Sequence, residues 1–210
     1  MTRDKQEIIK SVFRKKILPM LIQLNEPVRD NLEAAIIDKS RVLTVVKEQF
    51  IAESGDTEGH LIYFESGVAR CYHYDAAADK QVNTLIAKKD DVLIDVNAYL
   101  YGSRLAAYTQ MLESGVLITL SYANLKLLFA EFQTICPIFM FFLAEKEKQH
   151  AAYQHLLKSS ADERVKLFLD NNPGIATRIS NEHIANYLDM NRTTFSSAYA
   201  KYKSEKDKNR

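Results

Sequence analysis

The sequence of 210 residues predicts an α+β protein: an antiparallel β domain flanked by helices, a long helix, and a small helical domain at the C-terminus. Three observations support this. Strand-like segments separated by turn residues recur about every ten residues between 41 and 121, a spacing typical of an antiparallel sandwich, barrel or roll. The helical period of apolar residues is found on both sides of these segments. A long helical segment over 136–157 precedes the last, shorter helices.

The elements follow in order along the chain. An amphipathic helix is predicted over 5–24, with Pro19 near its end, and a second over 26–36. Further helices are predicted over 122–132, 136–157 and about 160–171. The predicted strands are 41–46, 49–54, 60–67, 68–75, 81–87, 91–96 and 115–121. We expect a sensor-like β domain over 1–135, a dimerisation helix and linker over 136–159, and a DNA-binding domain over 160–210.

Composition excludes several classes of protein. A hydrophobic content of 47% is enough for a buried core, and the net charge of +1 does not by itself indicate nucleic acid. The apolar run "CPIFMFFLA" is far shorter than the roughly 20 residues that cross a bilayer, so no membrane partner is expected. The N-terminus has no continuous apolar stretch typical of a secretory signal, so a cytoplasmic location is expected. Cys71 and Cys136 are too few for a disulfide framework, and both are expected to be buried.

The long helix over 136–157 carries two neighbouring stripes that are apolar at both ends and polar in the middle, where Lys146, Gln149 and His150 lie. Packing against its own domain would explain the ends. A homodimer seam would also explain the polar centre, because symmetry brings like residues together. We expect the homodimer. The stripes are Ile138, Phe142, Gln149, Ala152 and Leu156, and Phe139, Leu143, His150, Tyr153 and Leu157.

The C-terminal segment reads as two short helices, "SNEHIANYL" and "RTTFSSAYAKY", joined by "DMN". Ser180 and Asn191 are suitable N-caps for the two helices. The inward positions are then Ile184, Ala185, Leu188, Phe195, Ala198 and Tyr202. The small Ala185 allows close crossing of the two helices, as in a helix-turn-helix.

The outward face of the second helix carries polar side chains: Arg192, Thr193, Ser196, Ser197 and Lys201. A helix that enters a major groove uses such groups, because Arg bridges two acceptors of guanine and Ser or Thr reaches base edges or phosphates. A solvated helical hairpin is the alternative interpretation. From Arg192 to the end, six cations face two acids, which fits phosphate binding or a solvated tail equally well.

Three segments together resemble the Crp-Fnr family of transcription regulators. "ESGDTEGHLIYFESGVARCYHYD" is similar to the family's β-roll, in which Gly55 and Gly67 turn successive strands. "SSADERVKLFL" resembles the start of its DNA-binding domain, and "ISNEHIANYLDMNRTTFSSAYAKYK" its helix-turn-helix. The resemblance implies an N-terminal antiparallel β-roll like a cyclic-nucleotide-binding domain, a homodimer, and paired helices that read two-fold double-stranded DNA.

Carried over by position, the resemblance implies that Arg192, Thr193 and Ser197 read bases. It implies that three residues at the helix starts contact the DNA backbone, Ser180, Asn181 and Thr194. Ser197 stands where well-known members have a second arginine, so the target sequence should differ. Asp189 replaces the usual glycine of the turn, which Asp tolerates because it can adopt left-handed backbone angles. No strand pair, or wing, is recognised after the second helix, so affinity is expected to depend on the basic tail.

Cyclic-nucleotide-binding members carry Gly-Glu-Leu followed by Arg-Ser-Ala or Arg-Thr-Ala. Here Ile94 replaces the Gly, Asp95 can stand for the Glu, and "LAA" over 105–107 lacks the Arg. Arg104 is one position out of register, which on a strand turns it to the other face. We therefore expect a degenerate pocket that does not bind a cyclic nucleotide; an unidentified small-molecule effector is an open alternative. The expected lining is Leu93, Asp95, Tyr99, Tyr101, Arg104, Tyr108, Gln149 and His150.

Other cofactors and activities are disfavoured, and none is expected. Two cysteines are too few for an iron-sulfur cluster, and His73 is the only candidate haem ligand in the roll. A cupin-type metal enzyme would need a histidine spacing that His60, His73, His150, His155 and His183 do not provide. We expect a DNA-binding regulator rather than an enzyme. The alternative is a small-molecule-binding or protein-interaction module of this fold that has lost DNA binding.

Overall fold

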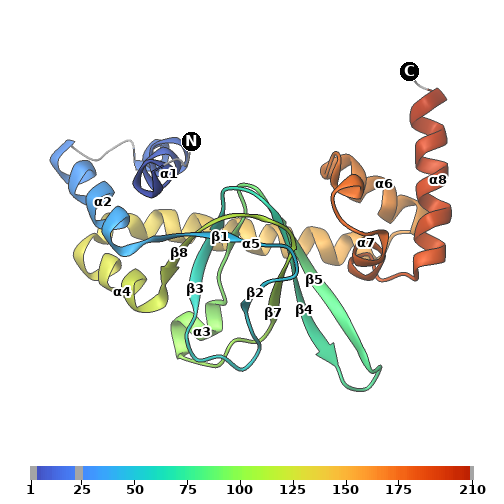
Figure 1. Ribbon diagram of the computed structural model, residues 1–210, viewed down its shortest axis with the longest axis horizontal. Helices are drawn as coiled ribbons and strands as arrows, with labels where there is room; N and C mark the ends of the chain where they lie inside the picture. The colour runs from blue at the N-terminus through green and yellow to red at the C-terminus, as the bar shows by residue number, and fades with distance from the viewer. Residues whose placement is uncertain (1–3, 22–25, 209–210) are drawn as a thin grey trace. The chain divides into compact units, whose positions relative to one another are not determined.

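The computed structural model describes residues 4–21 and 26–208, which form two compact units. The first unit comprises Met1–Ala69 and Ala87–Ala144, and the second comprises Arg70–Ile86 and Glu145–Arg210. The predicted α+β class is confirmed: two antiparallel sheets are accompanied by helices on both sides in the sequence (Figure 1). Helix α5 runs from the first unit into the second.

The strands form two four-stranded sheets, with the orders β1-β8-β3-β6 and β2-β7-β4-β5. In the first sheet β8 lies between β1 and β3, with Ile118 opposite both Val42 and Tyr63. The strands are β1 (Arg41–Val45), β2 (Phe50–Ala52), β3 (His60–Phe64), β4 (Val68–Asp75), β5 (Lys80–Lys88), β6 (Val92–Leu93), β7 (Tyr108–Glu113) and β8 (Gly115–Ser121). Gly55 and Gly67 both have positive φ, as expected for glycines that turn successive strands.

The helices are α1 (Lys5–Val12), α2 (Glu26–Lys39), α3 (Val96–Tyr101), α4 (Tyr122–Glu131), α5 (Cys136–Leu157), α6 (Ala161–Asn171), α7 (Asn181–Tyr187) and α8 (Arg192–Lys208). The predicted continuous helix over 5–24 is wrong. After α1 the chain makes a π-helical turn, Phe13–Ile17, and a 3-10 turn, Leu18–Leu21. Pro19 lies in the 3-10 turn and has no N–H to continue an α-helix. Residues 22–24 of the predicted helix lie outside the described part of the chain.

Apolar clusters hold the first unit together. Helix α1 packs Ile8 and Ile9 against Val42, Tyr63 and Ile118 of the first sheet. A larger cluster joins the N-terminal helices to α3, α4 and the start of α5, and Ile138 belongs to it. The N-terminal end of the stripe predicted as a dimer seam therefore packs in the core of its own unit. Its members there are Ile138, Phe139 and Phe142.

Neither cysteine is buried, which corrects the expectation. Cys71 on β4 is half-buried and Cys136 is exposed. Cys136 opens α5, where the neighbouring Ile135 and Ile138 take the buried positions instead. Among the described residues no single helix is long and apolar enough to cross a membrane. The pair Tyr122–Glu131 and Gln133–Leu157 passes that test only when joined, and it is bent by 113°.

Candidate nucleic-acid interface

Two capped helices, α7 and α8, form the helix-turn-helix of the second unit. Ser180 Oγ accepts the backbone N–H of His183 at 3.3 Å and so caps α7. Asn191 Oδ1 accepts the N–H of Thr194 at 2.8 Å and caps α8. Both caps agree with the sequence prediction. Each satisfies a backbone donor that the helix itself leaves unpaired, so the two starts are fixed by local chemistry.

The predicted inward face of the pair is buried. Ile184, Leu188 and Phe195 have no exposed surface, and Ala185 and Ala198 are nearly as buried. Tyr202 is half-buried and donates its O–H to Asp170 Oδ1 of α6 at 2.8 Å. Packing therefore fixes one face of α8 in spite of the weak helix propensity of its Thr and Ser residues. The opposite face needs no apolar residue for stability.

The turn between α7 and α8 is held by a residue that the sequence prediction missed. Asp189 has a φ of 50°, which confirms the left-handed conformation expected where relatives carry glycine. Arg164 Nη1 of α6 donates to the carbonyl of Leu188 at 2.7 Å and to that of Asp189 at 3.2 Å. These carbonyls lie at the C-terminal end of α7. A cation is favourable there because it donates hydrogen bonds to the unpaired carbonyls and lies at the negative end of the helix dipole. Arg164 thus connects α6 to the turn.

The polar residues predicted for the outward face of α8 are all exposed there, and they include the three candidate base readers, Arg192, Thr193 and Ser197, together with Ser196 and Lys201. Arg192 and Thr193 open the helix. Of the candidates for backbone contact, Ser180 is exposed, while Asn181 and Thr194 are half-buried at the starts of α7 and α8. One side of the helix pair therefore presents a guanidinium, several hydroxyls and an ammonium group.

The basic C-terminal segment is helical and partly neutralised. Lys201 Nζ lies 2.7 Å from Asp162 Oδ2, and Lys206 Nζ lies 3.1 Å from Asp170 Oδ1. Lys206, followed by Tyr202, lowers the pKa of the Asp170 carboxyl, and the same contact raises the pKa of Lys206. Both acids belong to α6, so two cations expected for a free tail hold α8 against α6 instead. The surface around α8 therefore carries less unbalanced positive charge than the sequence indicated.

The residues that correspond to the phosphate cassette are engaged with one another. Asp95 caps α3, accepting the N–H of Ala98 at Oδ1 (3.0 Å) and that of Ala106 at Oδ2 (3.0 Å). The N–H of Leu105 donates to the carbonyl of Asp56 at 2.9 Å. Two backbone donors of the segment 105–107 are thus already satisfied by oxygen atoms of the protein, and one of these atoms belongs to a carboxylate.

Two further contacts fix this region. Arg104 Nη1 donates to the carbonyl of Gly55 at 2.7 Å, so its guanidinium clamps a loop of the roll. The N–H of Asp95 donates to the hydroxyl of Tyr122 at 2.8 Å. Burial raises the pKa of Tyr122 to about 12, so this hydroxyl stays neutral at physiological pH. The side chains expected to bind an effector are used here in contacts within the protein.

The remaining residues that were predicted to line the effector pocket lie in different environments. Tyr99 is buried in an aromatic cluster, with its ring centroid 5.5 Å from that of Tyr122 and 5.3 Å from that of Phe139. Tyr101 is 79% exposed. Leu93 pairs with Ile62 in the first sheet, and Tyr108 packs edge-on against Phe50. Gln149 and His150 are exposed on the part of α5 that belongs to the second unit. Within the described residues no group of three His, Cys, Asp or Glu side chains could hold a metal ion.

Comparison with known proteins identifies the fold. No family model and no curated protein matches the sequence. Solved structures do match. FixK2 of Bradyrhizobium japonicum has a TM-score of 0.69 at 15% identity, over 79% of this chain and 85% of its own. A putative Crp/Fnr transcriptional regulator of Eubacterium rectale has a TM-score of 0.68 at 18% identity, over 89% and 87%. The regulator CLP of Xanthomonas campestris has a TM-score of 0.65 at 13% identity, over 84% and 92%. The resemblance to the Crp-Fnr fold is confirmed.

Proposed function

We propose that the protein is a sequence-specific DNA-binding transcription regulator that acts as a homodimer in the cytoplasm, without catalysis and without a cofactor. One observation carries this proposal most strongly: α8 is buried along one face and presents Arg192, Thr193 and Ser197 on the other. This division of faces suits a helix that must be rigid and still approach base edges. The Crp/Fnr regulator of Eubacterium rectale has a similar fold, which supports the same class of function.

Each exposed group has a role in the proposed complex. Arg192 bridges two acceptors of a guanine, and Thr193 and Ser197 contact neighbouring base edges. Ser196 lies on the same face and contacts phosphate or sugar, and Lys201 does so when a phosphate displaces Asp162 from its ammonium group. Ser180, Asn181 and Thr194 lie at helix starts, where backbone N–H groups and the helix dipole favour phosphate.

The dimer is proposed to form along α5. This helix has 22 residues, a length of roughly 33 Å, enough for a coiled-coil seam. Ile138 is buried in its own unit, whereas Met140 is 63% and Phe141 is 47% exposed on the same helix. Exposed apolar residues next to each other favour association with a second copy. A two-fold dimer then presents its two α8 helices to major grooves about 34 Å apart.

The roll is proposed not to bind cyclic nucleotides. A bound phosphate needs the donors of segment 105–107, yet Asp95 Oδ2 already accepts the N–H of Ala106. The carboxylate would repel the phosphate at short range, and no arginine replaces the missing cation because Arg104 is held by Gly55. The roll therefore acts as a scaffold for the dimer or responds to a chemically different effector.

A second candidate function is a small-molecule-binding or protein-interaction module that has lost DNA binding. The observation that favours it is the pairing of Lys201 with Asp162, which removes a cation from the proposed interface. Ser197 supports it too, because relatives with a second arginine at that position have a stronger base contact there.

Selection of bound fragments from the source genome at two salt concentrations separates the two functions. A regulator enriches a two-fold sequence motif that persists at the higher salt, because specific contacts weaken less than phosphate contacts alone. Arg192→Ala abolishes the enrichment while folding and dimerisation persist. Arg192→Lys keeps the charge but loses the planar guanidinium that donates two hydrogen bonds to one guanine. It therefore retains binding and broadens the motif. An unchanged motif with Arg192→Ala would remove Arg192 from base reading, and no enrichment by the unaltered protein would favour the second function.

A further inference from the structure

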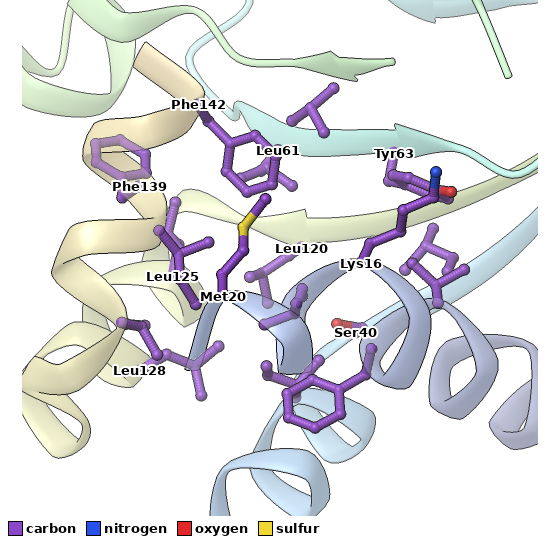
Figure 2. A pocket seen from close by; sticks show the side chains of 18 of the residues that line it. Lys16, Met20, Ser40, Leu61, Tyr63, Leu120, Leu125, Leu128, Phe139 and Phe142 are labelled. Carbon is purple, nitrogen blue, oxygen red and sulfur yellow. The ribbon is translucent and has the colours of Figure 1, made fainter. Parts of the chain in front are cut away.

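An apolar hollow of about 290 Å³ lies inside the first unit, away from the segment that corresponds to the phosphate cassette. It is lined by the N-terminal helical turns, the sheet β1-β8-β3-β6, α4 and the start of α5, and it is partly open to solvent (Figure 2). Its volume is at the lower end of the range of about 300–1000 Å³ found for small-molecule pockets. Apolar side chains make most of its wall, among them Phe13, Leu61, Leu120, Leu128, Phe139 and Phe142.

Lys16, Tyr63 and Asp90 form a linked polar group at one part of the wall, and Ser40 also lines the hollow. Lys16 Nζ lies 3.0 Å from Asp90 Oδ2, and the Tyr63 O–H donates to Asp90 Oδ1 at 2.6 Å. Figure 2 shows the ammonium end of Lys16 beside Tyr63, with Ser40 farther down in the view, away from that nitrogen. Both oxygens of the Asp90 carboxylate are thus occupied by donors from the protein. The ammonium group of Lys16 has three donor hydrogens, so it can hold a second acceptor beside Asp90.

A hollow of this kind differs from ordinary packing. Voids larger than a water molecule are few in protein interiors, and water in them needs two to four polar partners. Away from the polar group at Lys16, the aromatic and aliphatic wall offers water no such partners, and apolar cavities of smaller size take up apolar guests. Met20 extends across the hollow in Figure 2 and is 43% exposed, so an unbranched, flexible side chain lies between the cavity and solvent.

We infer that this hollow binds a single-chain aliphatic carboxylic acid, with its hydrocarbon chain among the apolar residues and its carboxylate at the ammonium group of Lys16. The head group follows from the chemistry of the rim. Lys16 provides donor hydrogens beyond the one directed at Asp90, while each oxygen of Asp90 already accepts a donor from the protein, one from Tyr63 and one from Lys16. A ligand that accepts hydrogen bonds and carries a negative charge therefore complements the rim better than a cation or a pure donor. This site does not rest on the proposed DNA binding, and its test leaves that function untouched.

Calorimetric titration of the full chain with decanoate, below the concentration at which decanoate forms micelles, tests the inference. The expected result is saturable binding of one molecule per chain. Lys16→Gln weakens decanoate binding about tenfold, because the carboxylate loses its ion pair with the ammonium group. It changes the binding of 1-decanol much less, because the alcohol carries no charge. Lys15→Gln is the matched control: Lys15 is exposed, neighbours Lys16 in sequence and does not line the hollow.

A second variant tests the location of the chain. Val12 lines the hollow, and Val12→Phe fills part of it, so both decanoate and 1-decanol should lose binding while circular dichroism reports an unchanged fold. The inference is overturned if neither ligand binds saturably, or if Lys15→Gln weakens decanoate as much as Lys16→Gln does. Equal weakening of acid and alcohol by Lys16→Gln would overturn the assignment of the head group. The two lysine variants are surface changes and give this answer even if Val12→Phe fails to fold.

Discussion

The side-chain amide of Asn186 pairs with the backbone of β5 at Asn83 in the way a neighbouring strand would. Asn186 Oδ1 accepts the N–H of Asn83 at 2.6 Å, and its Nδ2 donates to the carbonyl of Gln81 at 2.8 Å. Asn83 is fully buried, and its own Nδ2 donates to the carbonyl of His183 at 3.0 Å. Within the second unit, hydrogen bonds in both directions therefore join the β4-β5 hairpin to α7, the first helix of the helix-turn-helix.

Asn186→Ala should lower the free energy of unfolding of the second unit by about 1–3 kcal/mol, because it leaves a donor and an acceptor of β5 without partners. Urea unfolding and amide hydrogen exchange at Asn83 measure this loss. Asn186→Asp is the matched variant: it keeps the acceptor for Asn83 but turns a second acceptor toward the carbonyl of Gln81, so exchange at Asn83 should remain slower than in Asn186→Ala although stability also falls. Unchanged exchange at Asn83 in Asn186→Ala would contradict the contact.

Arg164→Ala should destabilise the turn between α7 and α8. The guanidinium donates to two carbonyls there, and a hydrogen bond that involves a charged group contributes about 1.5–3 kcal/mol. We expect a loss of that size in urea unfolding of the second unit, together with weaker retention of DNA fragments because Arg192 follows the turn directly. Lys166→Ala, an exposed cation of the same helix, should change stability by less than about 0.5 kcal/mol. Equal effects of the two variants would show that stability depends on positive charge on α6 rather than on the hydrogen bonds from Arg164 to the carbonyls of the turn.

Local signals explain what could be predicted from the sequence. The caps at Ser180 and Asn191 and the inward positions around Phe195 each depend on residues three or four positions apart, so their pattern is complete within one segment. The roles of Arg164 and Asn186 depend on partners far along the chain, at Leu188 and Asn83, and no local pattern contains them. Lys201 also has a partner far along the chain, Asp162 of α6, so the sequence alone indicates a free cation at this position.

Two elements of the roll, β7 and α3, were not predicted from the sequence, for different physical reasons. Strand β7 is buried at four consecutive positions, from Thr109 to Leu112, so it lacks the alternation of apolar and polar residues that identifies a half-exposed strand. Helix α3 has only six residues, too few for a helical period to show. A local signal did exist for α3: Asp95 three residues before Ala98 has the spacing of an N-cap. In the resemblance to the Crp-Fnr family, Asp95 instead takes the place of the cassette Glu.

Tyr63→Phe should change how the stability of the first unit depends on pH. The Tyr63 O–H, with a further contribution from Lys16, holds the pKa of Asp90 below its ordinary value, against a smaller effect of burial. A lowered pKa in the folded state stabilises the fold above the unfolded value of about 4, and this contribution disappears as the pH falls through the folded value. Tyr63→Phe should therefore cost under about 1 kcal/mol at neutral pH, since solvent screens Asp90, and less than that near about pH 3.

Carboxyl carbon shifts in an NMR titration measure the pKa of Asp90 directly, and urea unfolding at both pH values measures the stability. The pKa should rise in Tyr63→Phe. Tyr74→Phe is the control, because Tyr74 also donates its hydroxyl to an aspartate, Asp79, but at an exposed position remote from Asp90 in sequence. A loss of stability in Tyr63→Phe that is the same at both pH values would assign the effect to packing instead.

Met140→Glu should weaken the proposed dimer by at least about tenfold. Met140 is 63% exposed on α5 and does not line the apolar hollow, so the change leaves the core of the first unit intact. In a two-fold seam the substitution occurs on both copies, removes apolar contact area and brings two carboxylates together. Sedimentation at micromolar concentrations should then report a monomer with an unchanged circular dichroism spectrum.

Leu127→Glu is the matched control, because Leu127 is 57% exposed but lies on α4. If both variants remain dimeric, the seam lies elsewhere on the chain. If the unaltered protein is itself a monomer, the proposed homodimer is wrong and the two α8 helices have no fixed spacing with which to read a two-fold site.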